Sequence, residues 1–265
     1  YKDRQSPDKG THINDDQITD LVKIVSPYTE WIRTYGCTNG LENIGKIAHK
    51  AGLKIAAGAW LSGDTNANEV QIANLISASK AGEVDVAIVG SEVLHRGDLN
   101  ATQLINYIDR VKAAVPGIPV TTADVDKSLL DDPDVMKATD VLFVHIYPYW
   151  AGIKIDSAIG YLNAAYDTMV AHSDGKEVII AETGWPSEGG KRGMAVPSED
   201  NAATYFLNFT SWAKTRQVKY FYFEAFDEAW KSAHEGAVGA HWGIWNSNGK
   251  SLKPGIQTVF LREGK

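Results

Sequence analysis

Cysteine is nearly absent from this chain of 265 residues, and because Cys37 is the only one, no disulfide can form within it. Long basic runs are missing as well, and 26 basic against 33 acidic residues leave a formal charge of −7. This balance argues against nucleic acid or an anionic membrane as a partner. No apolar stretch approaches the roughly 20 residues of a membrane span, and no signal-peptide pattern opens the chain.

Short apolar runs alternate with amphipathic segments along the whole chain. Each apolar run is nearly continuous up to its end, as expected for parallel strands buried on both faces. The predicted strands are 31–36, 54–61, 85–94, 119–125, 140–149, 177–183 and 220–227. The predicted helices are 15–25, 41–51, 67–81, 101–114, 126–138, 154–172 and 198–216, with Asp98 and Ser198 as N-caps.

This alternation, without a break in composition, predicts one α/β domain over residues 1–265. We expect a (β/α)8 TIM barrel, a fold of about 250 residues. Only seven strands are visible, and the polar residues 1–10 resemble a loop, so the first strand is expected to be short or missing at the N-terminus. A doubly wound open sheet is the alternative. The barrel is favoured because no Gly-x-Gly-x-x-Gly follows the early strands and polar residues recur at the strand ends.

The C-terminal ends of the predicted strands carry an acidic and aromatic set of residues, and in a barrel these ends form the active-site rim. The set is Arg33, Tyr35, Trp60, Ser91, Glu92, Asp124, His145, Tyr147, Tyr149, Trp150, Glu182, Trp185, Glu224, Asp227 and Glu228. Cleavage of a glycosidic bond needs two carboxyl groups, one protonated and one ionised. Glu92, which ends an apolar run, and Glu182, which precedes Gly184 and Trp185, are the candidates for that pair.

Each of these polar residues also has a purely structural interpretation. Glu92 could form a salt bridge with Arg96, Glu182 could be a solvated loop residue, and Glu228 could pair with Lys231. His145 fits a core or rim histidine better than a metal ligand, because no second histidine lies at ligand spacing. We therefore expect no metal site and no cofactor.

ETGWPS at 182–187 is similar to the signature of glycoside hydrolase family 17, which comprises retaining enzymes active on β-1,3-glucan. The similarity continues in order through WIRTYGC at 31–37, AAGAWL at 56–61, IVGSE at 88–92, HIYPYW at 145–150, FYFEAFDEAWK at 221–231 and GAHWGIWN at 239–246. The chain most resembles microbial members, including β-1,3-glucanosyltransferases. The resemblance implies an eight-stranded barrel whose acid/base ends strand four and whose nucleophile ends strand seven.

At the matching positions, the resemblance implies that Glu92 is the acid/base and Glu182 the nucleophile. It also implies that Trp150 is a sugar platform and that Tyr147 lies near the cleavage point. With the rim residues, the predicted substrate-binding set is Tyr35, Ser91, Asp124, His145, Tyr147, Trp150, Trp185, Glu224, Glu228 and Lys231. One departure is Ser91, which stands where the family usually has an asparagine that contacts the 2-hydroxyl of the sugar. The absent first strand is a second departure.

The expected function is that of a retaining β-1,3-glucanosyltransferase acting through a covalent glycosyl-enzyme. An endo-β-1,3-glucanase that mainly hydrolyses is the alternative, and a non-catalytic glucan-binding barrel is less favoured. A phosphosugar enzyme using the loop 188–193 is a further, weaker alternative. The expected partner is a β-1,3-glucan. We expect the protein to be a monomer and this domain to make no membrane contact. The resemblance implies an extracellular, cell-wall or periplasmic location.

Overall fold

The computed structural model describes residues 1–262. Its contacts divide the chain into two compact units. One comprises His12–His145 and Met169–Ala181, and is called the sheet unit below. The other comprises Tyr1–Thr11, Ile146–Thr168 and the chain from Glu182 onward, and is called the aromatic unit. The expectation of one domain over the whole chain stays a prediction.

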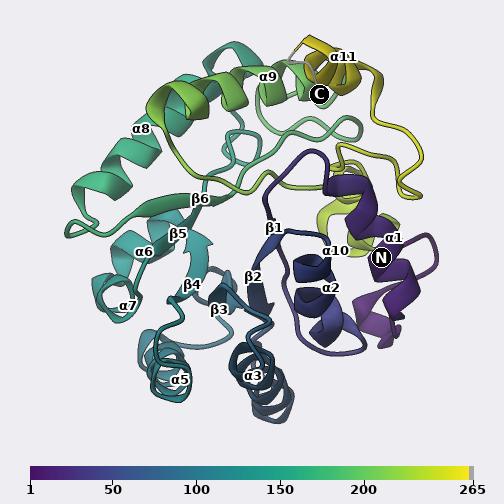
Figure 1. Ribbon diagram of the computed structural model, residues 1–265. Coiled ribbons are helices and arrows are strands. Elements are labelled where there is room, and N and C mark those ends of the chain that lie inside the picture. The colour runs from purple at the N-terminus through teal and green to yellow at the C-terminus, as the bar shows by residue number, and fades with distance from the viewer. Residues whose placement is uncertain (263–265) are drawn as a thin grey trace. The chain divides into compact units, whose positions relative to one another are not determined.

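Six strands form one sheet in the order of the chain (Figure 1). They are β1 (Trp31–Arg33), β2 (Lys54–Ala59), β3 (Val86–Ser91), β4 (Val120–Val125), β5 (Leu142–His145) and β6 (Val178–Glu182). Strands β1 to β5 pair in parallel, for example through Ile32 with Ile55 and Ala57 with Ala87. Strands β3 and β6 are buried at every residue, which explains their continuous apolar runs. Six of the seven predicted strands are therefore confirmed, each somewhat shorter than expected.

The helices of the sheet unit follow the strands in alternation. They are α1 (Asp15–Val25), α2 (Ile44–Lys50), α3 (Thr65–Lys80), α4 (Val93–Arg96), α5 (Ala101–Ala114), α6 (Asp126–Asp131) and α7 (Pro133–Ala138), with the 3-10 turn η2 (Leu41–Asn43) before α2. Helices α2 and α3 pack on β2, and α5 packs on β3 and β4. Helix α1 buries Ile18, Val22 and Val25, a spacing that places them on one face.

Two helix predictions need correction. The segment predicted as one helix at 126–138 is two helices, because Pro133 lacks the N–H that a continuous helix needs there. The N-cap of α5 is Asn100, not Asp98, and it forms a capping box with Gln103. Asp98 instead forms an ion pair with Arg96, at 2.7 Å between the carboxylate and Nε. Ser198 is confirmed as the N-cap of the helix that follows it.

The rest of the chain carries helices and long irregular segments. Its elements are η1 (Pro7–Lys9), η3 (Ile155–Ser157), α8 (Ala158–Ala171), α9 (Glu199–Arg216), η4 (Ala229–Lys231), α10 (Ser232–Glu235), η5 (Gly236–Ala240) and α11 (Pro254–Arg262). In the aromatic unit, α9 and α11 pack together around Phe206 and Ile256. Residues 1–10, all of which the structure describes, contain η1 and no strand. Within residues 1–262, no helix is both long enough and apolar enough to cross a bilayer.

The predicted strand at 220–227 is wrong as a regular strand. Phe223 donates its N–H to the Thr183 carbonyl, whereas Asp227 donates to Trp245, and a single bridge joins Phe226 to Trp245. The segment therefore bonds to two different stretches of chain, and none of its residues belongs to one of the six strands. Its aromatic, β-favouring composition does not reveal this, because the partners of its backbone are set by the tertiary fold.

Candidate active site

Glu92 occupies a tight turn between β3 and α4. Its backbone has a φ of +54°, a left-handed conformation that is uncommon for a residue with a side chain. Gly90, two residues earlier, has a φ of +80°, and a Cβ there would lie 2.5 Å from Cγ2 of Val93. Such local strain persists only where the surroundings enforce it, and it clusters at functional sites. The turn presents Glu92 with 29% of its side chain exposed.

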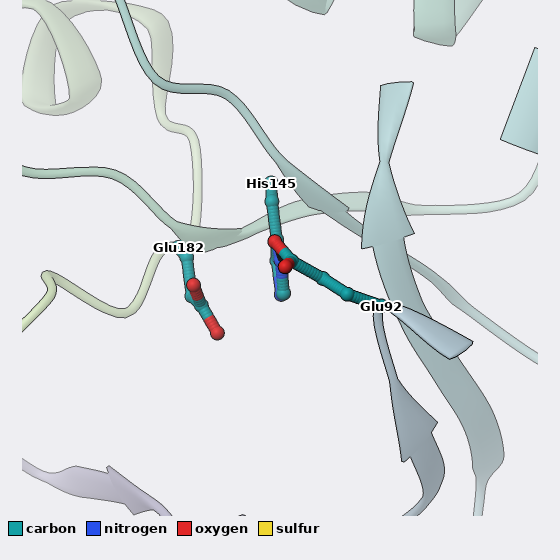
Figure 2. Close-up of side chains that lie close together, drawn as sticks. All are labelled: Glu92, His145 and Glu182. Carbon is teal, nitrogen blue, oxygen red and sulfur yellow. Dashed lines mark hydrogen bonds and ion pairs between the residues drawn. The ribbon is translucent and has the colours of Figure 1, made fainter. Parts of the chain in front are cut away.

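The carboxylate of Glu92 forms a hydrogen bond with His145, the last residue of β5 (Figure 2). Nδ1 of His145 lies 2.7 Å from Oε1 of Glu92, and the imidazole is fully buried. Burial raises the pKa of Glu92, but the bond to His145 and its positive neighbours hold the pKa below its ordinary value. The structural alternative for Glu92, an ion pair with Arg96, is wrong. The guanidinium of Arg96 binds Asp98 and the carbonyl oxygens of Ser91 and Leu61.

Arg33, the last residue of β1, contacts residues at the ends of three other strands of the sheet, β3, β5 and β6. Its Nη1 donates to the Ala181 carbonyl at 2.7 Å and lies 3.1 Å from Nε2 of His145. Its Nη2 donates to the hydroxyl of Ser91 at 3.0 Å, and the guanidinium lies 4.6 Å from the centre of the Tyr35 ring. The serine therefore serves as an acceptor for Arg33. Sequence reasoning placed Arg33 on the rim but did not find this network.

Asp124 does not present its carboxylate to a ligand, contrary to the prediction that it binds substrate. It is fully buried and accepts hydrogen bonds from the backbone N–H groups of Leu94 and Val125, at 2.9 and 2.8 Å. Burial outweighs these bonds and raises the pKa of Asp124. Because Leu94 belongs to α4, the carboxylate supports the turn that carries Glu92 and contributes to the site indirectly.

Glu182 ends β6 and is held by Tyr147. The Tyr147 hydroxyl donates to Oε2 of Glu182 at 2.8 Å, and the N–H of Ile146 donates to the Glu182 carbonyl at 3.0 Å. The ring of Tyr147 packs edge-on against Phe223 and Trp242, with centroid distances of 6.0 and 5.5 Å. Glu182 is therefore a buried carboxylate that accepts a hydrogen bond from Tyr147, and the solvated-loop interpretation is wrong.

Three tryptophans surround Tyr149 in the aromatic unit. Trp150 contacts it edge-on at 5.0 Å and lies 5.7 Å from Trp242. Trp185 is only 1% exposed, and its indole N–H donates to the Val196 carbonyl. The prediction that Trp185 binds sugar is therefore not met in this structure, because its ring is packed inside the unit. Trp242 was absent from the predicted site, although its motif, GAHWGIWN, had been noticed.

Glu224, Glu228 and Lys231 form a buried charged network in the aromatic unit. The Lys231 ammonium donates to Oε2 of Glu228 at 2.6 Å and to Oε2 of Glu224. Burial lowers the pKa of Lys231, but the two carboxylates raise it more, so it stays charged. Burial raises the pKa of Glu224 well above its ordinary value. The predicted ion pair of Glu228 with Lys231 is confirmed, whereas their contact with substrate stays a prediction.

His145 is poorly suited to bind a metal cation. Its Nδ1 is bonded to Glu92, and its Nε2 faces the guanidinium of Arg33, whose positive charge repels a cation. Both ring nitrogens are therefore committed within the sheet unit. The arrangement is that of a hydrogen-bonded carboxyl group, and acid–base chemistry is what it can perform.

Comparisons with known proteins find relatives over most of the chain. The profile of the BtgE/BtgC glycoside hydrolase domain matches residues 1–243. A glucan 1,3-beta-glucosidase of Candida albicans is 31% identical over 260 residues, which cover 88% of this chain and 83% of that protein. The crystal structure of a glycoside hydrolase family 17 beta-1,3-glucanosyltransferase from Rhizomucor miehei is 35% identical, with a TM-score of 0.84, and covers 92% of this chain and 91% of its own. An active-site mutant of the Rhizomucor miehei beta-1,3-glucanosyltransferase in complex with laminaritriose is 32% identical, with a TM-score of 0.83 and coverage of 94% and 97%.

Proposed function

This chain belongs to glycoside hydrolase family 17, through its BtgE/BtgC glycoside hydrolase domain, and on that premise we propose that it is a retaining β-1,3-glucanosyltransferase. The observation that supports the proposal is the placement of two glutamates. Glu92 follows the end of β3, Glu182 ends β6, and a hydrogen bond orients each carboxyl group, from His145 to Glu92 and from Tyr147 to Glu182.

In the proposed reaction, a carboxylate oxygen of Glu182 attacks the anomeric carbon while the protonated Glu92 donates its proton to the departing oxygen. The glycosidic C–O bond breaks, and a covalent glycosyl-enzyme forms. Glu92, now ionised, then removes a proton from the incoming acceptor. A glucan hydroxyl as acceptor lengthens a chain, and water as acceptor hydrolyses it.

Glu92 must acquire a proton for the first step although its resting pKa is lowered. Burial is the influence that raises this pKa, and 29% of the side chain is still exposed in the absence of a substrate. A glucan that covers the exposed part removes water from the carboxylate and strengthens the effect of burial. Substrate binding therefore favours the protonated form that the first step requires.

Tyr147 and Trp150 are the residues we propose as contacts for the sugar at the reaction centre and for its neighbour. Tyr147 already donates a hydrogen bond to the proposed nucleophile, and Trp150 is a half-buried tryptophan. We further propose Tyr35, Ser91, His145, Glu224, Glu228 and Lys231 as residues that contact substrate or support those contacts. We also propose that the chain forms a (β/α)8 barrel whose first strand is short or missing, and that it acts as a monomer. Its proposed location is the cell wall, the outside of the cell or the periplasm.

The test is a product time course on laminari-oligosaccharides of defined length. Products longer than the starting chain are expected early and at high substrate concentration, because transfer requires a bound acceptor. Only shorter products would favour the endo-β-1,3-glucanase. Loss of all turnover in Glu182→Ala, with binding of the oligosaccharide retained, is expected as well.

The non-catalytic alternative is tested by the same variant. If Glu182→Ala processed β-1,3-glucan as fast as the unmodified protein, the double-displacement mechanism would be wrong. The phosphosugar alternative is weakened by the loop 188–193, because Arg192 donates through Nε to the Trp150 carbonyl and stands over its ring at 5.4 Å. The guanidinium of Arg192 therefore already interacts with Trp150, and these interactions compete with binding of a phosphate.

A further inference from the structure

We propose that Arg33 is a positioning residue that fixes the tautomer of His145, so that His145 donates to one oxygen of Glu92 and leaves the other to carry the catalytic proton. This inference rests on the proposed function, in which Glu92 is the acid/base. It assigns positioning roles to Arg33 and His145, neither of which is a proton donor to the leaving group or a nucleophile in the proposed reaction. All the groups that it uses lie within that unit.

The tautomer follows from the chemistry of the guanidinium. Nη1 of Arg33 lies 3.1 Å from Nε2 of His145, and a guanidinium donates hydrogen bonds but cannot accept them. Nε2 must therefore be the acceptor, with no proton of its own. The proton of the neutral imidazole is then on Nδ1, which lies 2.7 Å from Oε1 of Glu92. His145 thus donates to the acid/base, and its orientation is fixed at both ring nitrogens.

Arg33 is held in place independently of His145. Its guanidinium also donates to the Ala181 carbonyl in β6 and to the hydroxyl of Ser91 in β3. The guanidinium therefore reaches from the end of β1 to the ends of two other strands of the same sheet. A group anchored in this way can impose one tautomer on a buried ring without moving itself.

The bond from Nδ1 decides which oxygen of Glu92 takes part in proton transfer. Oε1 accepts from the imidazole, so Oε2 is the oxygen that is left to hold the proton for the leaving group. The hydrogen bond from Nδ1 also fixes the orientation of the carboxyl group, so that Oε2 keeps one position relative to the imidazole.

Other charged groups near Glu92 do not replace this arrangement. His95 and Arg96 favour its ionised form, and Asp124 is influenced by Glu92 in turn. Arg96 binds Asp98 and two carbonyl oxygens, and Asp124 binds the backbone of α4. Arg33 is the group that the geometry assigns to Nε2 of His145.

The test is Arg33→Met, measured with two substrates that differ in their need for an acid. Cleavage of a laminari-oligosaccharide requires a proton on the leaving alkoxide, whereas a 2,4-dinitrophenyl β-glycoside of the same sugar releases a stable phenolate without one. We expect kcat/KM for the oligosaccharide to fall about 100-fold, the lower range for loss of general acid catalysis. For the dinitrophenyl substrate, we expect kcat/KM to stay within about threefold, because the acid contribution is absent there. Equal losses on both substrates, or no loss on either, would overturn the inference.

Two controls separate this inference from the proposed function. Arg110→Met makes the same substitution at an exposed arginine paired with Glu69, and we expect it to leave both substrates unaffected. Glu92→Ala should lose the oligosaccharide activity and keep kcat/KM for the dinitrophenyl substrate, whereas its kcat falls because the base of the second step is missing. If Glu92→Ala behaves so and Arg33→Met does not, only the role of Arg33 fails; if Glu92→Ala retains full oligosaccharide activity, the proposed function fails.

A spectroscopic measurement tests the tautomer even if Arg33→Met does not fold. In the wild-type protein labelled with ¹⁵N-histidine, long-range proton–nitrogen correlations distinguish a protonated Nδ1 from a protonated Nε2. We expect a neutral His145 with the proton on Nδ1, identified by the loss of its signals in His145→Asn. A proton on Nε2, or a doubly protonated ring at neutral pH, would contradict the inference without reference to activity.

Discussion

Lys231→Met is expected to destabilise the protein strongly, and in a manner that depends on pH. The Lys231 side chain is 9% exposed and its ammonium is shared by the carboxylates of Glu224 and Glu228, which are 13% and 15% exposed. Loss of the ammonium leaves both carboxylates without the cation that they share. Removal of one partner from a buried ion pair costs about 3–5 kcal/mol, because the remaining charge is uncompensated.

The pH dependence follows from the direction of the pKa shift. Burial already raises the pKa of Glu224 above its ordinary value of 4.5, and loss of the lysine removes the influence that lowers it. The folded variant therefore retains a proton that the unfolded chain has released. The stability of the variant relative to the wild type is highest below the pKa that Glu224 has in the unfolded chain, and it decreases as the pH rises above that pKa.

Urea unfolding followed by tryptophan fluorescence at pH 4 and pH 8 measures both effects. We expect the deficit of about 3–5 kcal/mol at pH 8 and a clearly smaller one at pH 4. Adding Glu224→Gln to Lys231→Met should restore part of the stability at pH 8, since one of the two carboxylates that lose the ammonium is then replaced by a neutral amide. Lys137→Met, at an exposed lysine paired with Asp134, should leave the midpoint unchanged. A deficit below about 1 kcal/mol at pH 8, or one independent of pH, would refute the reasoning.

Two further predictions concern the sheet unit. Gly90→Ala is expected to lower the free energy of unfolding by about 2–5 kcal/mol, because it combines a left-handed backbone with a Cβ 2.5 Å from Cγ2 of Val93. In urea unfolding, the loss caused by Gly90→Ala should be smaller in a Val93→Ala background than in the wild type. An equal loss in both backgrounds would show that the Cβ does not clash with Val93. Cys37 is buried and burial raises the pKa of its thiol to about 12, so it should not react with a thiol reagent at pH 8 until urea unfolds the protein. Labelling at equal rates in native buffer and in urea would show that the thiol is accessible.

Much of the fold was predictable because the relevant signal is local in the sequence. Helix α5 has the predicted bounds, 101–114, since its apolar residues recur with helical spacing and its start is capped nearby. Strands β3 and β6, which end near Glu92 and at Glu182, were predictable because each is a continuous apolar run in the sequence. The identity of the cap was less predictable, because Asp98 and Asn100 are both good N-cap residues and only the backbone geometry selects Asn100.

Functional placement was harder to predict wherever it depended on which segments meet. Asp124 and Trp185 are residue types common in sugar-binding sites. In this fold, however, Asp124 accepts a hydrogen bond from the backbone of α4, and the buried Trp185 donates one to the Val196 carbonyl. The aromatic segment 220–227 favours a strand by composition, but its hydrogen bonds go to two separate stretches. No local pattern encodes these outcomes, because each is a contact between residues distant along the chain.

The sequence by itself determined the alternation of strands and helices, the strand-end position of the two glutamates and the family to which the chain belongs. These properties depend on residue spacing and on short ordered motifs. Only the tertiary structure decided that Arg33 meets His145, 112 residues away, and that His145 meets Glu92, 53 residues away. Proton position depends on such contacts, because a donor or acceptor acts only within hydrogen-bond distance. The sequence therefore identified the candidate acid, and the packing of the strand ends decided how it is held.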